Sequence, residues 1–309
     1  MESRRKGFCV GLSLLLLGSS MMLVTLPLAA QTSSPAIPTI EPTQPAALEQ
    51  LNQGLAWIEQ GKLPEAIAAF RQAVQLNRQL APAYYNLGLA LRQLGQLQES
   101  EQVFYQATQT DPSFALAFAN LGAARLELQN LAQAQADLLQ ALELDPNLGV
   151  AHYNLGLVLS KTGELEQAIR AFNRAMQLSR NAPEPAYHLG ITYWQQGKIE
   201  LARKALQRAI QINPQYSEAH YSLGSIWFNQ GEFEAALDAF RQAATANSNY
   251  ANAYYAAGLV FLRQNRFSDA EQMLQYARDL YKAQGNWQWA TKAEQGLEAA
   301  RNSIPQELR

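Results

Sequence analysis

The chain has 309 residues, of which 48% are hydrophobic and 16% are charged, and its formal net charge is −2. An average globular protein has roughly 25% charged residues, so much of the polar surface here must be neutral. The small negative charge gives no basic surface for nucleic acid. The single cysteine, Cys9, excludes a disulfide framework or a cysteine-based metal cluster within one chain.

Residues 1–30 have the order of a secretory signal sequence. Basic residues at positions 4–6 precede an apolar stretch over residues 8–28, and Ala29 and Ala30 supply the small residues of a cleavage site. The apolar stretch also approaches the ~20 residues that span a bilayer, so an uncleaved N-terminal anchor is the alternative. Both interpretations predict an exported protein, in a periplasm or a comparable extracytoplasmic compartment, with membrane contact only through an uncleaved N-terminus.

Residues 31–46 read QTSSPAIPTIEPTQPA and contain four prolines among Ser, Thr and Gln. A segment of this composition cannot bury a core, which predicts an extended, disordered spacer. We expect it to hold the folded part of the chain away from a membrane or a cleavage site.

The remainder of the chain repeats with a period of 34 residues over residues 47–282. The glycines that share this spacing are Gly54, Gly88, Gly122, Gly156, Gly190, Gly224 and Gly258. Twelve residues after each glycine the chain has Ala or Ser, and nineteen residues after it the chain always has Ala. Similarity at a fixed period over seven units indicates a repeat architecture. Positions in a repeat are numbered here so that this glycine is position 8.

Each repeat is predicted to be a pair of antiparallel helices. In the fourth repeat the spacing i, i+3, i+4, i+7 of one helix face is formed by His152, Leu155, Gly156 and Leu159. A second apolar set at positions 20, 24 and 27 indicates a second helix, which a pair such as Asp145-Pro146 should end. A glycine inside a helix costs about 1 kcal/mol relative to Ala. Its recurrence at position 8 predicts a neighbouring helix too close for a Cβ atom.

These features resemble the tetratricopeptide repeat family, which has Leu-Gly at positions 7 and 8, aromatic residues near positions 4 and 11, and Ala at positions 20 and 27. The sequence departs from that pattern mainly at its ends, at Gln50, Gln53 and Ala257. The resemblance implies an all-α fold, a right-handed superhelical solenoid of seven helix-turn-helix repeats. Residues 283–309 are expected to add a C-terminal capping helix and a tail.

The resemblance also implies that the first helix of each repeat lines a concave groove, through positions 2, 5, 6, 9 and 12. Position 6 is asparagine in four successive repeats: Asn52, Asn86, Asn120 and Asn154. An asparagine amide donates and accepts hydrogen bonds, so it can pair with both polar groups of an extended peptide backbone. The row is similar to the asparagine ladder of protein O-linked sugar transferases, although simple solvation of these side chains is the alternative.

Aromatic and apolar side chains are the second feature of the predicted groove. The predicted peptide-binding residues of this kind are Tyr85, Tyr153, Tyr187, Tyr221, Tyr255, Leu89, Leu157, Trp194 and Phe228. The basic residue Arg92 is predicted to line the groove with them. Tyrosine combines contact area with a hydroxyl group, which suits a binding surface. Ala119 and Ala123 predict a recess for a bulky partner side chain. The alternative is that the groove side chains pack on one another.

Several other functions are not supported by the sequence. The carboxylate clamp of some members of this family needs Lys at position 5 and Asn at position 9, and no repeat has either, so chaperone tails are not expected partners. The chain has no Gly-rich phosphate loop and no G-x-S-x-G or H-E-x-x-H motif. It therefore predicts neither an enzyme nor a cofactor. His152, His188 and His220 lie in different repeats and predict no metal site.

The sequence thus favours an exported, bacterial-type, non-enzymatic scaffold that binds extended peptide segments in its groove. Its expected role is the assembly of envelope or membrane complexes. A polysaccharide-export or glycan-binding scaffold that uses the groove tyrosines is the alternative, and the identity of the partner stays open in both cases.

Overall fold

The computed structural model describes residues 43–303, which contain helices and no strand. The helices are α1 (Thr43–Glu59), α2 (Leu63–Leu76), α3 (Ala81–Gln93), α4 (Leu97–Thr110), α5 (Ala115–Glu127), α6 (Leu131–Leu144), α7 (Gly149–Thr162), α8 (Leu165–Leu178), α9 (Glu184–Gln195), α10 (Ile199–Ile212), α11 (Ser217–Gln230), α12 (Phe233–Ala246), α13 (Ala251–Arg263), α14 (Phe267–Ala283) and α15 (Trp287–Ser303). The predicted signal or anchor, residues 31–42 of the predicted spacer, and residues 304–309 lie outside the described residues.

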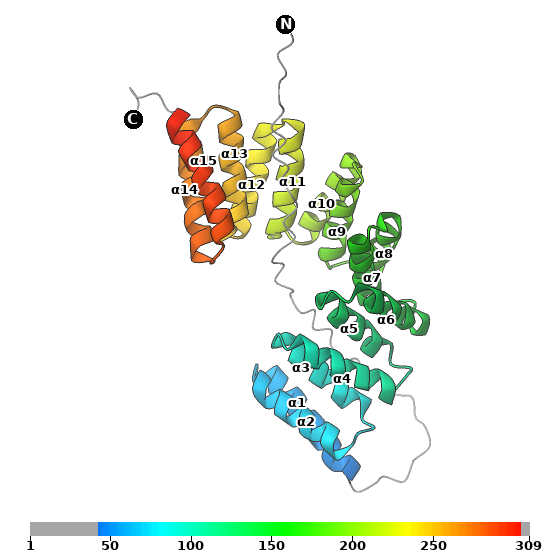
Figure 1. Ribbon diagram of the computed structural model, residues 1–309. Helices are drawn as coiled ribbons and strands as arrows, with labels where there is room; N and C mark the ends of the chain where they lie inside the picture. The colour runs from blue at the N-terminus through cyan, green and yellow to red at the C-terminus, as the bar shows by residue number, and fades with distance from the viewer. Residues whose placement is uncertain (1–42, 304–309) are drawn as a thin grey trace. The chain divides into compact units, whose positions relative to one another are not determined.

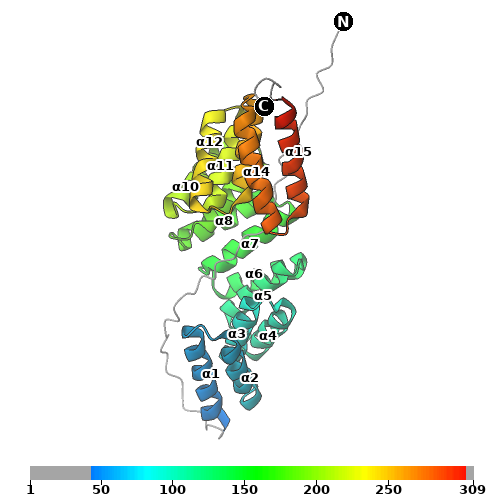
Figure 2. The same ribbon diagram turned by 90° about the vertical axis from the view of Figure 1, so that its left-hand side faces the viewer.

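The helices follow one another as antiparallel pairs in chain order (Figure 1), and the view from the side shows the same succession (Figure 2). Each first helix packs against its own second helix, and each second helix packs against the first helix of the next repeat. The seven pairs from α1–α2 to α13–α14 are the predicted repeats, and α15 is the predicted capping helix. The prediction of an all-α repeat solenoid is confirmed.

The first helix is longer than the repeat pattern indicates. It begins at Thr43, four residues before the predicted start of the first repeat at residue 47. Pro45 therefore lies in the first helical turn, where backbone N–H groups have no intrahelical partner and a proline is tolerated.

At the glycine of position 8 the two helices of a repeat approach each other closely. A Cβ atom added to Gly156 would lie 2.6 Å from Cδ1 of Phe172, whose side chain is fully buried. The corresponding distances in the seven repeats are 2.4–2.8 Å, always to a Phe or Leu at position 24. Ser100, which replaces Ala at position 20, donates its hydroxyl hydrogen to the Gly88 carbonyl at 2.8 Å. The predicted close approach is therefore present in every repeat.

The helix ends follow local sequence signals. Gly163, at position 15, ends α7 with φ of 85°, in the left-handed region. The third and seventh repeats place Gln129 and Asn265 at this position, with φ of 62° and 59°. Helix α6 ends before Asp145, because the residue that precedes Pro146 adopts an extended conformation.

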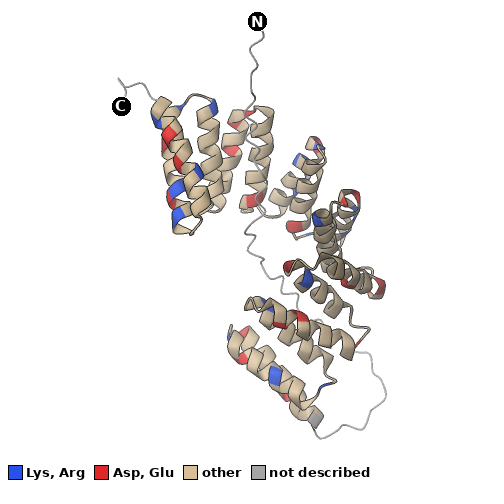
Figure 3. Ribbon diagram, in the orientation of Figure 1, with Lys and Arg blue, Asp and Glu red and all other residues tan. Residues whose placement is uncertain are grey.

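Charged residues are sparse along the ribbon (Figure 3). One partly buried network links consecutive helices: Arg125 of α5 contacts Glu101 of α4 at 2.9 Å and Asp137 of α6 at 2.8 Å. Within residues 43–303, none of the helices has the length and apolar content needed to cross a bilayer.

Candidate functional site

The predicted groove residues all lie on first helices. The described first helices approach their successors directly at α3–α5, α5–α7, α7–α9 and α11–α13. Tyr85 contacts Asn120 and Tyr153 contacts His188, so position 5 of one repeat meets position 6 of the next, and the two positions form adjacent rows along these helices. These two rows are the candidate site.

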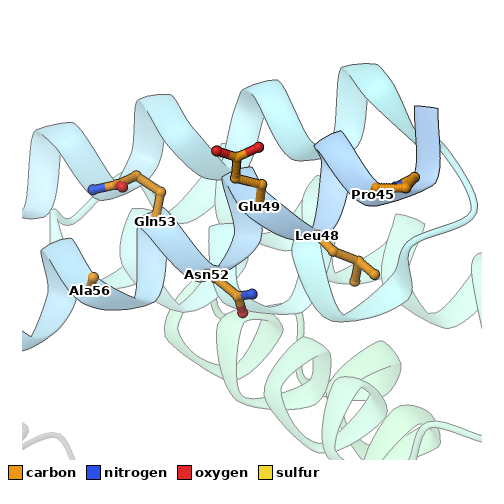
Figure 4. Close-up of a pocket in the computed structure, with 6 residues that line it drawn as sticks. All are labelled: Pro45, Leu48, Glu49, Asn52, Gln53 and Ala56. Atoms are coloured by element: carbon orange, nitrogen blue, oxygen red, sulfur yellow. The ribbon is translucent and has the colours of Figure 1, made fainter. Parts of the chain in front are cut away.

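The four asparagines of position 6 lie in different environments. Asn52 is exposed on α1, where it lines an open hollow with Leu48 and Gln53 (Figure 4). Asn86 donates its amide hydrogen to the carbonyl of Pro82 at 2.7 Å, one turn earlier in its own helix. The four amides are therefore not equivalent.

The other two asparagines are more deeply placed. Asn120 donates to the Leu116 carbonyl at 2.9 Å, and its nitrogen lies 3.4 Å from the hydroxyl oxygen of Tyr85. Asn154 is only 5% exposed, yet its side-chain amide makes no hydrogen bond to any other described residue. The enclosed side-chain polar atoms without a hydrogen bond in the described residues belong to Gln196, Arg203 and Gln264. The amide of Asn154 therefore reaches the surface, where a ligand can bind it.

The tyrosines of position 5 pack against residues that sequence reasoning missed. These residues stand at position 34, in the loop before the next repeat. The ring centroids are 4.9 Å apart for Tyr85 and Phe114, 5.2 Å for Tyr187 and Tyr216, and 5.5 Å for Tyr221 and Tyr250. The available signal was the aromatic character of position 34 in three repeats, which lies outside the helix-face pattern.

The end of the solenoid has a similar aromatic arrangement. The ring of Tyr255 lies 5.5 Å from that of Trp289 on the capping helix and 6.3 Å from that of Tyr281 on α14. The Tyr281 hydroxyl donates to Oδ1 of Asn252 at 2.6 Å. The last tyrosine of position 5 thus contributes to the attachment of the cap.

His188 occupies position 6 in the fifth repeat, next in the row after Asn154. Its ring stacks on Phe172 at a centroid distance of 5.9 Å and contacts Tyr153 at 5.7 Å and Tyr187 at 4.9 Å. Burial, together with the nearby charge of Lys161, lowers the pKa of His188 to about 4. The imidazole is therefore neutral at physiological pH and keeps one donor and one acceptor nitrogen.

The tyrosine hydroxyls are also neutral. Burial raises the pKa of Tyr153, Tyr187 and Tyr216, and burial raises the pKa of Tyr221 to about 12. Glu184 raises the pKa of Tyr153 further. All of these phenols therefore stay protonated and can donate a hydrogen bond over the physiological pH range.

The recess predicted at Ala119 and Ala123 is not open. The two alanines are 0% and 2% exposed, because α7 packs directly on α5 at this point. Tyr153 and Leu157 of α7 lie against the apolar cluster that contains Ala119. The small side chains serve helix packing here, so they leave no space for a partner side chain.

The remaining predicted residues are partly buried. Arg92 is engaged in an ion pair with Glu127 of α5, in which its Nε donates to Oε1 at 2.8 Å. Trp194 packs on the apolar cluster of the fifth and sixth repeats, and the Phe228 ring lies 6.0 Å from that of Phe233. Leu89 likewise lies half-buried against the cluster of Phe104.

The two histidines of position 4 have a structural role. Nε2 of His152 lies 3.0 Å from the carbonyl oxygen of Pro146, and Nε2 of His220 lies 3.0 Å from that of Pro214. Each ring thus ties a first helix to the turn that precedes it. Among residues 43–303 there is no group of His, Cys, Asp and Glu that could hold a metal ion.

The sequence matches the family described as the cilia and flagella-associated protein 70 C-terminal domain, a tetratricopeptide repeat family, over residues 28–248. A search of curated proteins gives no match.

Several solved structures share the fold. A tetratricopeptide repeat protein from Parabacteroides merdae is 18% identical with a TM-score of 0.64, over 81% of this chain and 99% of that one. PilF of Pseudomonas aeruginosa is 19% identical with a TM-score of 0.59, over 69% of this chain and 97% of that one. A chain of the APC/C hetero-tetramer Cut9–Hcn1 is 18% identical with a TM-score of 0.62, over 82% of this chain and 52% of that one. At these identities the similarity shows the fold alone.

Proposed function

Because the chain belongs to the tetratricopeptide repeat family of the cilia and flagella-associated protein 70 C-terminal domain, we propose that it binds extended segments of partner proteins along its first helices. Helical repeat solenoids of this type are in general non-enzymatic scaffolds for protein–protein interaction. The finer proposal concerns where the partner binds and which side chains hold it.

The observation that carries the proposal is the unpartnered amide of Asn154. This amide is not enclosed by the chain, so a ligand can reach it without breaking a hydrogen bond within the described residues. The backbone of an extended peptide presents an N–H and a C=O group that an asparagine can bind together. On one side of Asn154 the row continues to Asn120. The amide N–H of Asn120 donates to the Leu116 carbonyl of its own helix, and its amide oxygen can accept a hydrogen bond. On the other side it continues to the neutral imidazole of His188.

The tyrosines support a peptide ligand better than a glycan. Stacking on a sugar requires an open ring face, whereas Tyr187 is 7% exposed and its ring contacts both His188 and Tyr216. These packed rings fix the position-5 side of the row of position 6, and Asn154 belongs to that row.

A selection of random twelve-residue peptides displayed on phage tests the proposal. The peptides are selected on the full chain, and the bound pool is then measured on Asn154→Ala and on Asn173→Ala. Asn173 is the matched control, because its amide donates to the Ile169 carbonyl at 2.9 Å on a second helix. We expect Asn154→Ala to lose about tenfold in affinity and Asn173→Ala to bind as the wild type does. Equal binding by both variants would refute the proposed site.

We also propose that residues 1–30 export the chain and that it assists the assembly of envelope or membrane complexes. The support is the order of basic residues, apolar stretch and small residues in that segment. Fractionation of cells that produce the chain, followed by mass measurement of the exported form, tests this proposal. Retention of the full-length chain in the cytoplasm would contradict it.

A further inference from the structure

We infer that a basic surface on helices α8 and α10 binds an acidic segment of a second partner protein. The basic surface is formed by Arg170, Arg174, Lys204 and Arg208. It lies on second helices, so it is separate from the proposed peptide site on the first helices and does not depend on that site.

The four cations occupy equivalent positions in two neighbouring repeats. Arg170 and Lys204 stand at position 22 of the fourth and fifth repeats, and Arg174 and Arg208 stand at position 26. Because the two positions are four residues apart, they lie on the same face of each helix. In the other five repeats neither position has a Lys or an Arg. The basic surface is therefore confined to α8 and α10.

The cations of the basic surface are available to a ligand. Arg170, Lys204 and Arg208 are exposed, and no carboxylate within residues 43–303 forms an ion pair with them. Arg174 is half-buried and donates to neutral amide oxygens, of which that of Asn147 lies 2.7 Å from Nη2. The positive charge of these side chains is thus not neutralised by the described part of the chain.

The carboxylates carried by the same two helices are engaged with other groups. Glu200 of α10 pairs with Arg203 at 2.9 Å. Glu166 of α8 accepts a hydrogen bond from Nε2 of Gln196 at 2.8 Å. The arginines of the other second helices are paired, in contrast to those of the basic surface: Arg71 with Glu99, Arg241 with Asp238, and Arg278 with Asp279 and Glu294.

The helix ends do not account for the basic surface. The dipole of a helix favours a cation only within the last turn. Arg170 and Lys204 are each the sixth residue of a fourteen-residue helix. A requirement of the ligand, and not of the helix, therefore explains why the same two positions carry cations in two successive repeats.

An extended acidic segment fits this surface in charge and in length. Guanidinium and ammonium groups form charge-assisted hydrogen bonds with carboxylates. Helix α9 packs between α8 and α10, so at about 8–10 Å for each packed pair the axes of α8 and α10 lie no more than about 20 Å apart. About six extended residues span that distance. One short acidic segment can therefore contact cations of both helices.

The flanking second helices favour such a narrow ligand over an anionic membrane. Helix α6 carries Asp137 and Glu143 and has no Lys or Arg, and α12 carries Glu234 and Asp238 against the single cation Arg241. A broad anionic surface that covered α8 and α10 would also meet these carboxylates, which repel it. A segment only two helices wide avoids them.

The fluorescence anisotropy of a labelled hexaglutamate peptide, titrated with the full chain, tests the inference. The test variants are Arg170→Gln/Arg174→Gln on α8 and Lys204→Gln/Arg208→Gln on α10. The control is Arg263→Gln/Lys282→Gln, which removes two exposed cations elsewhere and therefore changes the net charge equally. We expect each test variant to weaken binding about threefold to tenfold, because two charge pairs are lost, and the control to bind as the wild type does. Circular dichroism verifies that each variant is folded.

Several results would overturn the inference. Absence of hexaglutamate binding by the wild type would do so, and so would an equal loss in the control, because binding would then follow net charge. A loss in the variant of one helix alone would show that the ligand does not span both. Binding to vesicles of phosphatidylglycerol that the test variants abolish, without binding of hexaglutamate, would identify a membrane surface instead.

The Asn154→Ala variant separates this inference from the proposed function. We expect it to bind hexaglutamate as the wild type does, because Asn154 lies on a first helix. A loss of hexaglutamate binding in Asn154→Ala would place the acidic peptide on the first helices and overturn the inference. Failure of the peptides selected for the first helices would leave the binding of hexaglutamate unaffected.

Discussion

Replacement of Gly156 by alanine tests the packing that defines each repeat. An alanine gains about 1 kcal/mol of helix propensity over glycine, so a glycine without a steric role should be improved by the change. The new Cβ would lie 2.6 Å from Cδ1 and Cε1 of Phe172, well inside the 3.5–4.0 Å of a favourable carbon contact. Phe172 is fully buried and cannot turn out to solvent. Overpacking of this kind costs about 1–3 kcal/mol.

We therefore expect Gly156→Ala to lower the free energy of unfolding by up to about 2 kcal/mol, which is the overpacking cost less the gain in helix propensity. The measurement is guanidinium chloride denaturation followed by far-UV circular dichroism. Gly296→Ala on α15 is the matched control, because there the nearest atom is Cδ1 of Leu274 at 3.2 Å, which a small shift can relieve. The control should be neutral or more stable by up to about 1 kcal/mol. A Gly156→Ala variant more stable than the wild type by about 1 kcal/mol would refute the steric account of position 8.

Two further predictions concern the turn of the third repeat and the row of position 6. Gln129→Gly should raise the free energy of unfolding by about 0.5–1 kcal/mol, because Gln129 has φ of 62° and a left-handed non-glycine residue costs about 1–2 kcal/mol. The converse change, Gly163→Gln, should lower the free energy of unfolding, and denaturant titration measures both. A change in the same direction for the two variants would contradict this reasoning. The folded pKa of His188, about 4, lies below the unfolded value near 6.5, so the stability that depends on the neutral ring is present above about pH 6.5 and is lost as the pH falls towards 4. Between pH 7.5 and pH 5 the free energy of unfolding should fall by about 1–2 kcal/mol more in the wild type than in His188→Asn. If the free energy of unfolding has the same pH dependence in both proteins, the ring is not buried in its neutral form.

The fold could be predicted because its information is periodic. Each glycine at position 8 faces a Phe or Leu at position 24 of the same repeat, so one local constraint recurs seven times. Position 15 of the third and seventh repeats, where the glycine is replaced, shows that the repeat keeps its structure without every signature residue. Gln129 and Asn265 keep the left-handed turn without a glycine, because the helices that pack on either side already fix its geometry.

The candidate site was harder to predict, because identical residues at one position have different neighbours. Asn86 and Asn120 donate to the carbonyls of Pro82 and Leu116, whereas Asn154 has no such bond. The open recess predicted at Ala119 was wrong for a related reason: a small side chain in the groove can equally admit the next helix, and α7 fills the space. Sequence periodicity places a side chain on a face but does not determine how closely adjacent helices approach.

The aromatic residues of position 34 show how differences between neighbouring residues affect the candidate site. Phe114, Tyr216 and Tyr250 lie in loops, yet each packs on the position-5 tyrosine of its own repeat. In the fourth repeat position 34 is Ala182, so the Tyr153 ring instead contacts His188 of the next repeat. At that point a ring–ring contact between repeats replaces the ring–loop pair within a repeat, and Asn154 is the residue that follows Tyr153 in α7. A peptide that binds Asn154 would lie beside Tyr153, whose ring packs on the ring of His188 in the following repeat. Partner binding and the packing of successive repeats are therefore coupled at the junction of α7 and α9.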